Sequence, residues 1–261
     1  MPVQFLTPAQ RAAYGAYASE ISAEDLSRYF HLDDEDWAAL EDKRGDHNRL
    51  GYALQLTTAR FLGTFLPNPI EVPPAVLRSL GRQLQILDFD RLSDYRDGRQ
   101  RWLHTMEIRA RYDFREWTEP SIGFRLSRWL YALCWTGTER PSILFERATA
   151  WLLANKVLLP GCTVLERFIA KLRGRVEERL WKLLTQGIQS DQRLRLENLL
   201  QVTPDGRTSV LDQLRTGPVR VSGPALVKAI QRLETVRHLG IKLPDAGVPP
   251  SRLSSLARFA A

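Results

Sequence analysis

The stretch from Arg44 to Leu66 constrains the fold more than any other part of the chain, because its core-type residues recur at the spacing of an α-helix. Asp46 precedes them and is expected to be the N-cap, accepting hydrogen bonds from the backbone amides of the first turn. The positions expected to form the buried stripe are Leu50, Leu54, Thr57, Phe61, Leu62 and Phe65. The sequence therefore predicts a long helix with one buried face and a polar, basic first turn.

The same spacing, interrupted by prolines and glycines, continues along most of the chain. Thr7 before Pro8, and Ser22 before an acidic first turn, are typical helix starts. Further helices are expected near 33–42, 74–85, 90–95, 98–113, 120–136, 141–154, 163–186, 225–239 and 252–261. A short strand pairing is expected only near 219–221. The predicted fold is all-α, with several helical modules that include helix-turn-helix-like units.

Four domains are predicted from the breaks between these helices. The segment 67–74 contains four prolines and cannot be helical, so it marks the first boundary. The four domains are an N-terminal helical module (1–66), a second basic module (67–136), a helix-turn-helix-like module with a long basic helix (137–187), and a helical connector (188–261).

The charge is distributed unevenly. The chain has 37 Lys and Arg against 30 Asp and Glu, a net charge of +7. Residues 1–42 hold nine acids against two arginines, so they carry −7 and the remainder carries +14. A basic body of this kind attracts polyanions, and the planar guanidinium of arginine suits phosphates and guanine edges. A solvated charged surface is the alternative interpretation.

Several features that mark other protein classes are missing from the sequence. No secretory signal begins the chain, and no apolar run approaches the ~18–20 residues of a membrane helix. Cys134 and Cys162 are far apart in apolar contexts, which predicts reduced thiols in a cytoplasmic protein. The four histidines lack the spacing of zinc ligands, and no phosphate-binding loop or nucleophile elbow is present. The sequence predicts no metal, cofactor, small-molecule ligand or membrane contact for this chain.

Basic and amide side chains gather on three of the expected helices. The first group lies on the first turn of the helix from Asp46, where a major groove could be read: Arg44, His47, Asn48 and Arg49. The second lies on 98–113, where Trp102 and Met106 are expected to point inward: Arg99, Arg101, His104 and Arg109. The third is a row at four-residue spacing on 163–186: Arg167, Lys171 and Arg175, continued by Lys182. A capped core helix with a solvated start, and a solvated helix flank, are the alternatives for the first and third groups.

Short motifs that occur in order along the chain carry a resemblance to a known family. They are Met1–Thr7, Arg28–Leu32, Arg44–Gly51, Arg60–Leu66, Phe124–Leu126, Glu139–Pro141, Leu144–Phe145, Leu159–Gly161, Gly217–Pro218 and Ser222–Ala225. Each motif alone is weak, but the ordered set covers nearly the whole chain. The sequence resembles the N-terminal region of replicative transposases of the Tn-three family of bacterial transposons.

The resemblance implies a function. It implies that several helical modules bind the terminal inverted repeats of a transposon, in the bacterial cytoplasm at the nucleoid. It places catalysis in a large C-terminal domain, RNase-H-like, where a carboxylate triad holds two divalent metals such as Mg²⁺. This chain ends at Ala261, before any such domain, so a shortened form or partial gene product without enzymatic activity of its own is expected.

The resemblance also implies roles for the basic groups, and one alternative stays open. Arg44, Asn48 and Arg49 become the base-reading candidates, because asparagine suits adenine and arginine suits guanine. Thr163 joins Arg167, Lys171 and Arg175 as the third group. The acidic segment 33–42 is expected to pack against a basic part of the protein or to stay solvated. The alternative function is an all-α assembly module of the transposition complex, which self-associates and binds DNA only nonspecifically.

Overall fold

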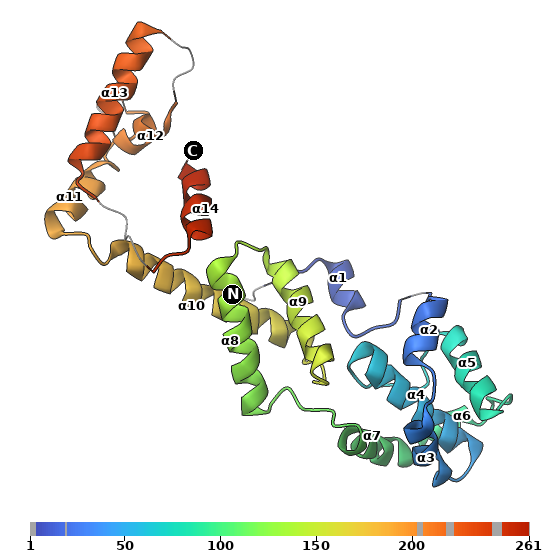
Figure 1. Ribbon diagram of the computed structural model, residues 1–261. Coiled ribbons are helices and arrows are strands. Elements are labelled where there is room, and N and C mark those ends of the chain that lie inside the picture. Colours follow the sequence, from blue (N-terminus) through green and yellow to red (C-terminus); the bar gives the residue numbers. More distant parts are fainter. Residues whose placement is uncertain (1–3, 19, 203–205, 218–221, 242–246, 261) are drawn as a thin grey trace. The chain divides into compact units, whose positions relative to one another are not determined.

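The computed structural model describes residues 4–18, 20–202, 206–217, 222–241 and 247–260 (Figure 1). Within these ranges the chain forms helices, and its only β-type pairings are two isolated bridges, at Arg115–Val157 and Val202–Ser209. The all-α prediction is therefore confirmed. The strand pairing expected near 219–221 falls outside the described residues.

The described chain divides into two units. The first comprises Met1–Leu130 and Arg140–Ala170, and the second comprises Tyr131–Glu139 and Lys171–Ala261. Two long helices contribute to both units: α8 (Pro120–Thr136) and α10 (Cys162–Thr185). The other helices of the first unit are α1 (Pro8–Ala13), α2 (Ala23–Tyr29), α3 (Asp34–Glu41), α4 (Asp46–Leu62), α5 (Pro74–Leu84), α6 (Leu92–Asp97), α7 (Gln100–Arg111) and α9 (Pro141–Ala154).

Helix α4 is the centre of the first unit, where it contacts α2, α3, α5, α6 and α7 (Figure 1). Every residue from Leu50 to Ala59 is buried, so the prediction of a single buried stripe was too narrow. A helix that is surrounded in this way belongs to the core and not to a surface layer. Because the same core continues from Phe30 to Tyr112, the predicted boundary at residues 66–67 does not separate two cores.

The start of α4 differs from the prediction. Gly45 is the N-cap residue, with a φ of 85°, and Asp46 is the first helical residue. The Asp46 carboxylate does not cap the helix but lies 4.0 Å from the Arg49 guanidinium. The caps expected at Thr7 and Ser22 are confirmed, since each side chain accepts from a backbone amide of its own first turn.

Gly51 permits the close approach of α6 to α4. A Cβ placed at Gly51 would lie 2.3 Å from the ring of Tyr95, a fully buried side chain of α6. Any other residue here would have to displace that ring. The glycine that ends the Arg44–Gly51 motif therefore has a packing function, and it brings Tyr95 into the polar network described below.

The N-terminal segment packs against residues about 140 positions later in the chain. The Phe5 and Tyr14 rings lie edge-on to Phe145 of α9, with ring centroids 6.3 and 5.0 Å apart, and the Tyr14 hydroxyl donates to the Pro160 carbonyl at 2.9 Å. The Leu159 amide donates to the Gly63 carbonyl at 2.8 Å. The predicted domain 1–66 and residues 140–170 of the predicted domain 137–187 therefore belong to one folded unit, a long-range arrangement that local sequence signals do not encode.

The second unit has a smaller buried core. Its helices, besides the ends of α8 and α10, are α11 (Ser190–Asn198), α12 (Val210–Arg215), α13 (Gly223–His238) and α14 (Pro250–Ala260). Arg252 of α14 donates to the Cys134 carbonyl of α8, and Arg195 of α11 donates to the His238 carbonyl at 2.7 Å. No residue of α13 is buried, although the helix carries several large apolar side chains.

Candidate nucleic-acid interface

The first predicted group lies together at the start of α4. Arg44 is exposed, and its side chain has no partner among the described residues, while His47, Asn48 and Arg49 are half-buried. The Asn48 side-chain amide donates to the Arg44 carbonyl at 2.8 Å, so one of its hydrogen-bonding groups is already used. Arg44 is therefore the most accessible cation of this turn, and Arg49 is held near Asp46.

The second predicted group lies on α7, which is rotated relative to the prediction. Trp102 and Met106 were expected to point inward, but their side chains are 63% and 67% exposed. His104 and Ile108 form the buried face instead. Arg99 is exposed, Arg109 pairs with Glu116, and the Arg101 guanidinium lies 4.9 Å from the centroid of the Trp102 ring.

A buried polar network explains this rotation. The Gln55 side-chain amide donates to the Tyr95 hydroxyl at 2.6 Å and to the Arg101 carbonyl at 3.0 Å. The Tyr95 hydroxyl lies 2.9 Å from His104 Nδ1, and Thr105 donates to Gln55 Oε1 at 2.6 Å. A buried polar group is costly unless it is hydrogen-bonded. With His104 turned inward, the His104 ring nitrogen and the Thr105 hydroxyl of α7 both have partners in this network.

His104 is therefore corrected from a candidate DNA contact to a core residue. It is 4% exposed, and burial, assisted by the charge of Lys43, lowers its pKa from the ordinary 6.5 to about 4. The imidazole is neutral at neutral pH and cannot meet a phosphate from this position.

The lowered pKa of His104 makes folding depend on pH. Between pH 6.5 and about 4 the unfolded chain binds a proton at this position and the folded chain does not, so stability falls as the pH falls through this window. We expect the free energy of unfolding to drop by about 2–3 kcal/mol between pH 7 and 4.5 from this group alone. Urea unfolding of the wild type and of His104→Gln at both pH values measures the contribution. An equal pH dependence in the two proteins would contradict it.

The third predicted group lies on α10, whose first turn is fixed by a buried carboxylate. Glu166 is fully buried and accepts from the Arg11 guanidinium at 2.7 Å and from the Phe5 and Leu6 amides at 3.3 Å each. Arg11 also donates to the Thr163 hydroxyl at 3.3 Å. These contacts hold the N-terminal segment against the start of α10. The sequence offered no signal for Glu166 beyond its place next to the apolar stripe.

Beyond this anchored turn, α10 presents the predicted basic row to solvent. Arg167, Lys171 and Arg175 are exposed, and none of the three side chains has an ionic partner among the described residues. The neighbouring Arg173 lies 3.8 Å from Glu177 and is not part of the row. Leu165, Ile169 and Leu172 are buried on the other side, as predicted.

The helix-turn-helix arrangement of α9 and α10 stays a prediction. Seven residues, 155–161, connect the two helices, whereas the turn of a helix-turn-helix has roughly three to four. Part of this connection is engaged elsewhere, because the Arg115 amide donates to the Lys156 carbonyl at 2.8 Å and the Leu158 amide donates to the Arg115 carbonyl at 2.9 Å. The connection between α9 and α10 therefore also pairs with the backbone at Arg115.

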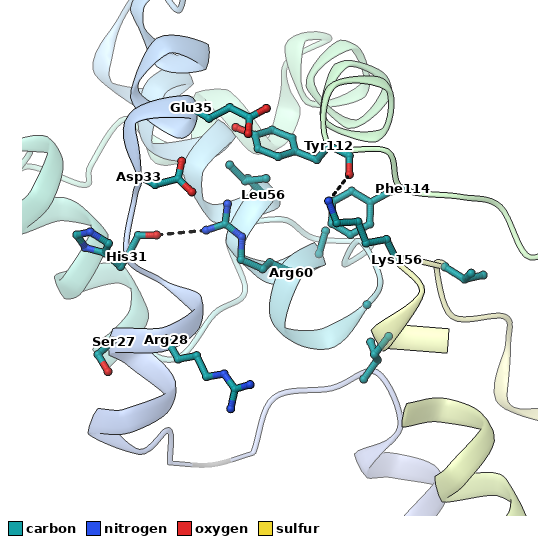
Figure 2. Close-up of a pocket in the computed structure, with 14 residues that line it drawn as sticks. Ser27, Arg28, His31, Asp33, Glu35, Leu56, Arg60, Tyr112, Phe114 and Lys156 are labelled. Atoms are coloured by element: carbon teal, nitrogen blue, oxygen red, sulfur yellow. Dashed lines mark hydrogen bonds between the residues drawn. The ribbon is translucent and has the colours of Figure 1, made fainter. Parts of the chain in front are cut away.

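A cavity of about 470 Å³ in the first unit contains none of the predicted site residues (Figure 2). Arg28, Arg60 and Lys156 line it together with Asp33 and Glu35, so its charges are mixed. Two of its three cations donate hydrogen bonds within the protein: Arg60 donates to the His31 carbonyl at 3.2 Å, and Lys156 donates to the Tyr112 carbonyl at 3.3 Å. The cavity gives no indication of a particular ligand.

The described residues contain neither a cluster of metal-ligating side chains nor a helix that could span a membrane. No group of three or more histidine, cysteine, aspartate or glutamate side chains in the described ranges is arranged to hold a metal ion. Among the helices formed by those residues, none combines the length and the apolar character needed to cross a bilayer.

Comparison with known proteins identifies relatives along the whole chain. Residues 5–172 match the family described as a domain of unknown function (DUF4158). The transposase for transposon gamma-delta from Escherichia coli is 46% identical over 263 residues, which cover 100% of this chain and 26% of that protein. The transposase for transposon Tn1546 from Enterococcus faecium is 27% identical, and that for transposon Tn501 from Pseudomonas aeruginosa is 28% identical. These two alignments cover 98% and 91% of this chain, and 26% and 24% of the relatives.

The chain thus spans about a quarter of the length of the curated relatives that it matches. The alignments support the resemblance that the ordered motifs indicated. The chain belongs to the family described as a domain of unknown function (DUF4158), and it is homologous to a part of the transposases of the Tn-three family.

Proposed function

We propose that this chain binds duplex DNA at transposon ends, as the DNA-recognising part of a transposase. The observation that carries the proposal is the row of Arg167, Lys171 and Arg175, which face solvent on α10 and have no acidic partner in the part of the chain that the structure describes. Unpaired cations at four-residue spacing on one helix face can follow a phosphate backbone, since they release counterions when they bind it. The homology to transposases supports DNA as the polyanion.

The start of α4 supplies the best candidates for reading bases. Arg44 is exposed and has no side-chain partner within the described ranges, and Asn48 and Arg49 lie close to it in the sequence, on the first turn of α4. Arginine and asparagine form bidentate hydrogen bonds with guanine and adenine edges in the major groove. Phosphate contacts from α10 would position the protein, while this turn would provide sequence preference. Strand transfer, with its carboxylates and Mg²⁺, we assign to the part of the relatives that this chain does not span.

A second candidate function is assembly of the transposition complex, and α13 favours it. Five large apolar side chains of this helix are 47–70% exposed: Leu226, Val227, Ile230, Leu233 and Val236. Exposed apolar surface of this extent on one helix is typical of a protein contact. Self-association without a preference between specific and scrambled DNA would favour this function over DNA recognition.

Removing the basic row should weaken DNA binding and its salt dependence together. We expect the Arg167→Ala/Lys171→Ala/Arg175→Ala variant to lower the slope of log K against log salt by about 3, since each lost phosphate contact removes about 1. The measurement is fluorescence anisotropy with a labelled duplex carrying one end of transposon gamma-delta, and with a scrambled duplex of equal length, at several salt concentrations.

The matched control is Arg173→Ala, on the same helix, whose guanidinium lies near Glu177. It should leave the slope nearly unchanged. Preference of the wild type for the transposon end at all salt concentrations would support sequence recognition. Equal affinity for both duplexes would overturn it, and an unchanged slope in the triple variant would overturn the role of the row.

A further inference from the structure

Helix α7 exposes an apolar surface in the midst of positive charge. The period of 3.6 residues places Arg99, Trp102, Leu103, Met106 and Ala110 on one face of α7 and its N-terminal flank. Trp102, Leu103 and Met106 are 63%, 49% and 67% exposed. We call these five residues the α7 face. A soluble protein rarely leaves a tryptophan and a methionine side by side in water without a use for them.

The charges around the α7 face favour a nucleic acid as its partner. Between residues 96 and 115 the chain has six arginines and three acidic residues. Arg96, Arg109 and Arg115 pair with Asp97, Glu116 and Glu119, so Arg99, Arg101 and Arg111 are the ones without a carboxylate partner among the described residues. Two of the acids are engaged by cations: Asp97 bonds Arg96, and Glu107 bonds Lys43 at 2.7 Å. The α7 face itself contains no acid, and the Arg99 side chain has no partner among the described residues. A partner that is both anionic and able to cover apolar side chains fits this surface.

The exposed Trp102 ring contacts the neighbouring arginine and stands on a helix that is bonded to the core. The Arg101 guanidinium lies over it at 4.9 Å from the ring centroid, a cation–π contact that leaves the ring largely exposed. The helix beneath is fixed to the core, because the Arg101 carbonyl accepts from Gln55 and Thr105 donates to Gln55. The two apolar side chains therefore project from a rigid support.

We propose that Trp102 and Met106 form a wedge that enters the bound duplex at a base-pair step, unstacks it and kinks the DNA. Proteins that deform DNA insert apolar side chains between base pairs in this way, with cations nearby to hold the backbone. Arg99 and Arg101 would hold the phosphates beside the kinked step. The inference rests on the proposed function, because it requires the chain to bind duplex DNA, and it assigns to α7 a role other than base reading.

The test uses the full chain and the gamma-delta end duplex with 2-aminopurine placed at successive positions, since the fluorescence of this base rises when it is unstacked. A second duplex, with dyes at both ends, reports bending by energy transfer. The wild type should raise the fluorescence at one step and produce a kink of roughly 20–90°. Trp102→Ala/Met106→Ala should lose both signals, and its affinity should fall about tenfold while the salt slope stays unchanged.

The control is Leu87→Ala, because Leu87 is an apolar side chain outside α7 and is 80% exposed. This variant should retain both signals. Tight binding by the wild type without unstacking or bending would overturn the wedge and leave the proposed function intact. The wedge would also fail if the double variant kept both signals, or if it lost only self-association. Absence of any duplex binding by the wild type would refute the proposed function and the wedge together.

Discussion

Replacing Arg60 by methionine should lower the free energy of unfolding of the first unit by about 3–5 kcal/mol. The Asp36 carboxylate is fully buried, and Arg60 donates to its two oxygens at 2.8 and 2.9 Å. Without the guanidinium, an ionised carboxylate would stay buried without its cation, and its desolvation would no longer be offset. Hydrogen exchange of the α4 amides, followed by mass spectrometry, measures the change within this unit.

Two controls separate the buried charge from the loss of an ion pair. Arg60→Met/Asp36→Leu removes both charges and should recover much of the loss, because no uncompensated charge remains. Arg91→Met breaks an exposed pair with Asp94 at 3.2 Å and should cost less than about 1 kcal/mol. If Arg60→Met lowers the free energy of unfolding by no more than Arg91→Met does, the burial of Asp36 does not explain the contribution of the Arg60–Asp36 pair.

Replacing Arg11 by methionine should release the N-terminal segment from α10, with a loss of about 3 kcal/mol. Of its partners among the described residues, Glu166 would keep the Phe5 and Leu6 amides, at 3.3 Å each, and a buried carboxylate needs more compensation than two long hydrogen bonds provide. Hydrogen exchange should accelerate both in residues 5–13 and in the first turns of α10. DNA affinity should fall with it, because Thr163 and Arg167 lie on those turns.

The matched control is Arg128→Met, since Arg128 is an exposed arginine of α8 without a partner among the described residues. Hydrogen exchange of the Arg128→Met variant, in residues 5–13 and in the first turns of α10, should equal that of the wild type. Protection in residues 5–13 that survives Arg11→Met would show that the aromatic contacts with Phe145, and not the ion pair, hold the segment.

Local signals predicted the helices well. Thr7 with Pro8, and Ser22 with its acidic first turn, each start a helix where expected, because capping depends on residues within four positions of each other. The exposed row on α10 was also predictable, since the buried Leu165, Ile169 and Leu172 fix which face is left for solvent. The helical period shows which residues face solvent, but it does not show whether this row binds DNA.

Long-range packing was not predictable from the same signals. Apolar periodicity placed Trp102 inward, but the network through Gln55 and Tyr95 turned His104 inward instead. In the sequence, Asp36 and Glu166 resemble ordinary surface acids. In the structure both are buried, Asp36 beside α4 and Glu166 against the N-terminal segment. In each case the deciding partner lies 9 to 161 positions away in sequence, beyond the reach of capping or helical spacing.

The bonds from Phe5 and Leu6 to Glu166 also set an order for folding during synthesis. The core around α4 needs only residues up to Tyr112, so it can form while the rest of the chain is still being made. The N-terminal segment must wait until the ribosome has released Glu166, about 160 residues later. The Phe5 and Tyr14 rings wait for Phe145, and the Arg11 side chain waits for Thr163 and Glu166, so the first part of the chain to emerge is among the last to be fixed in place.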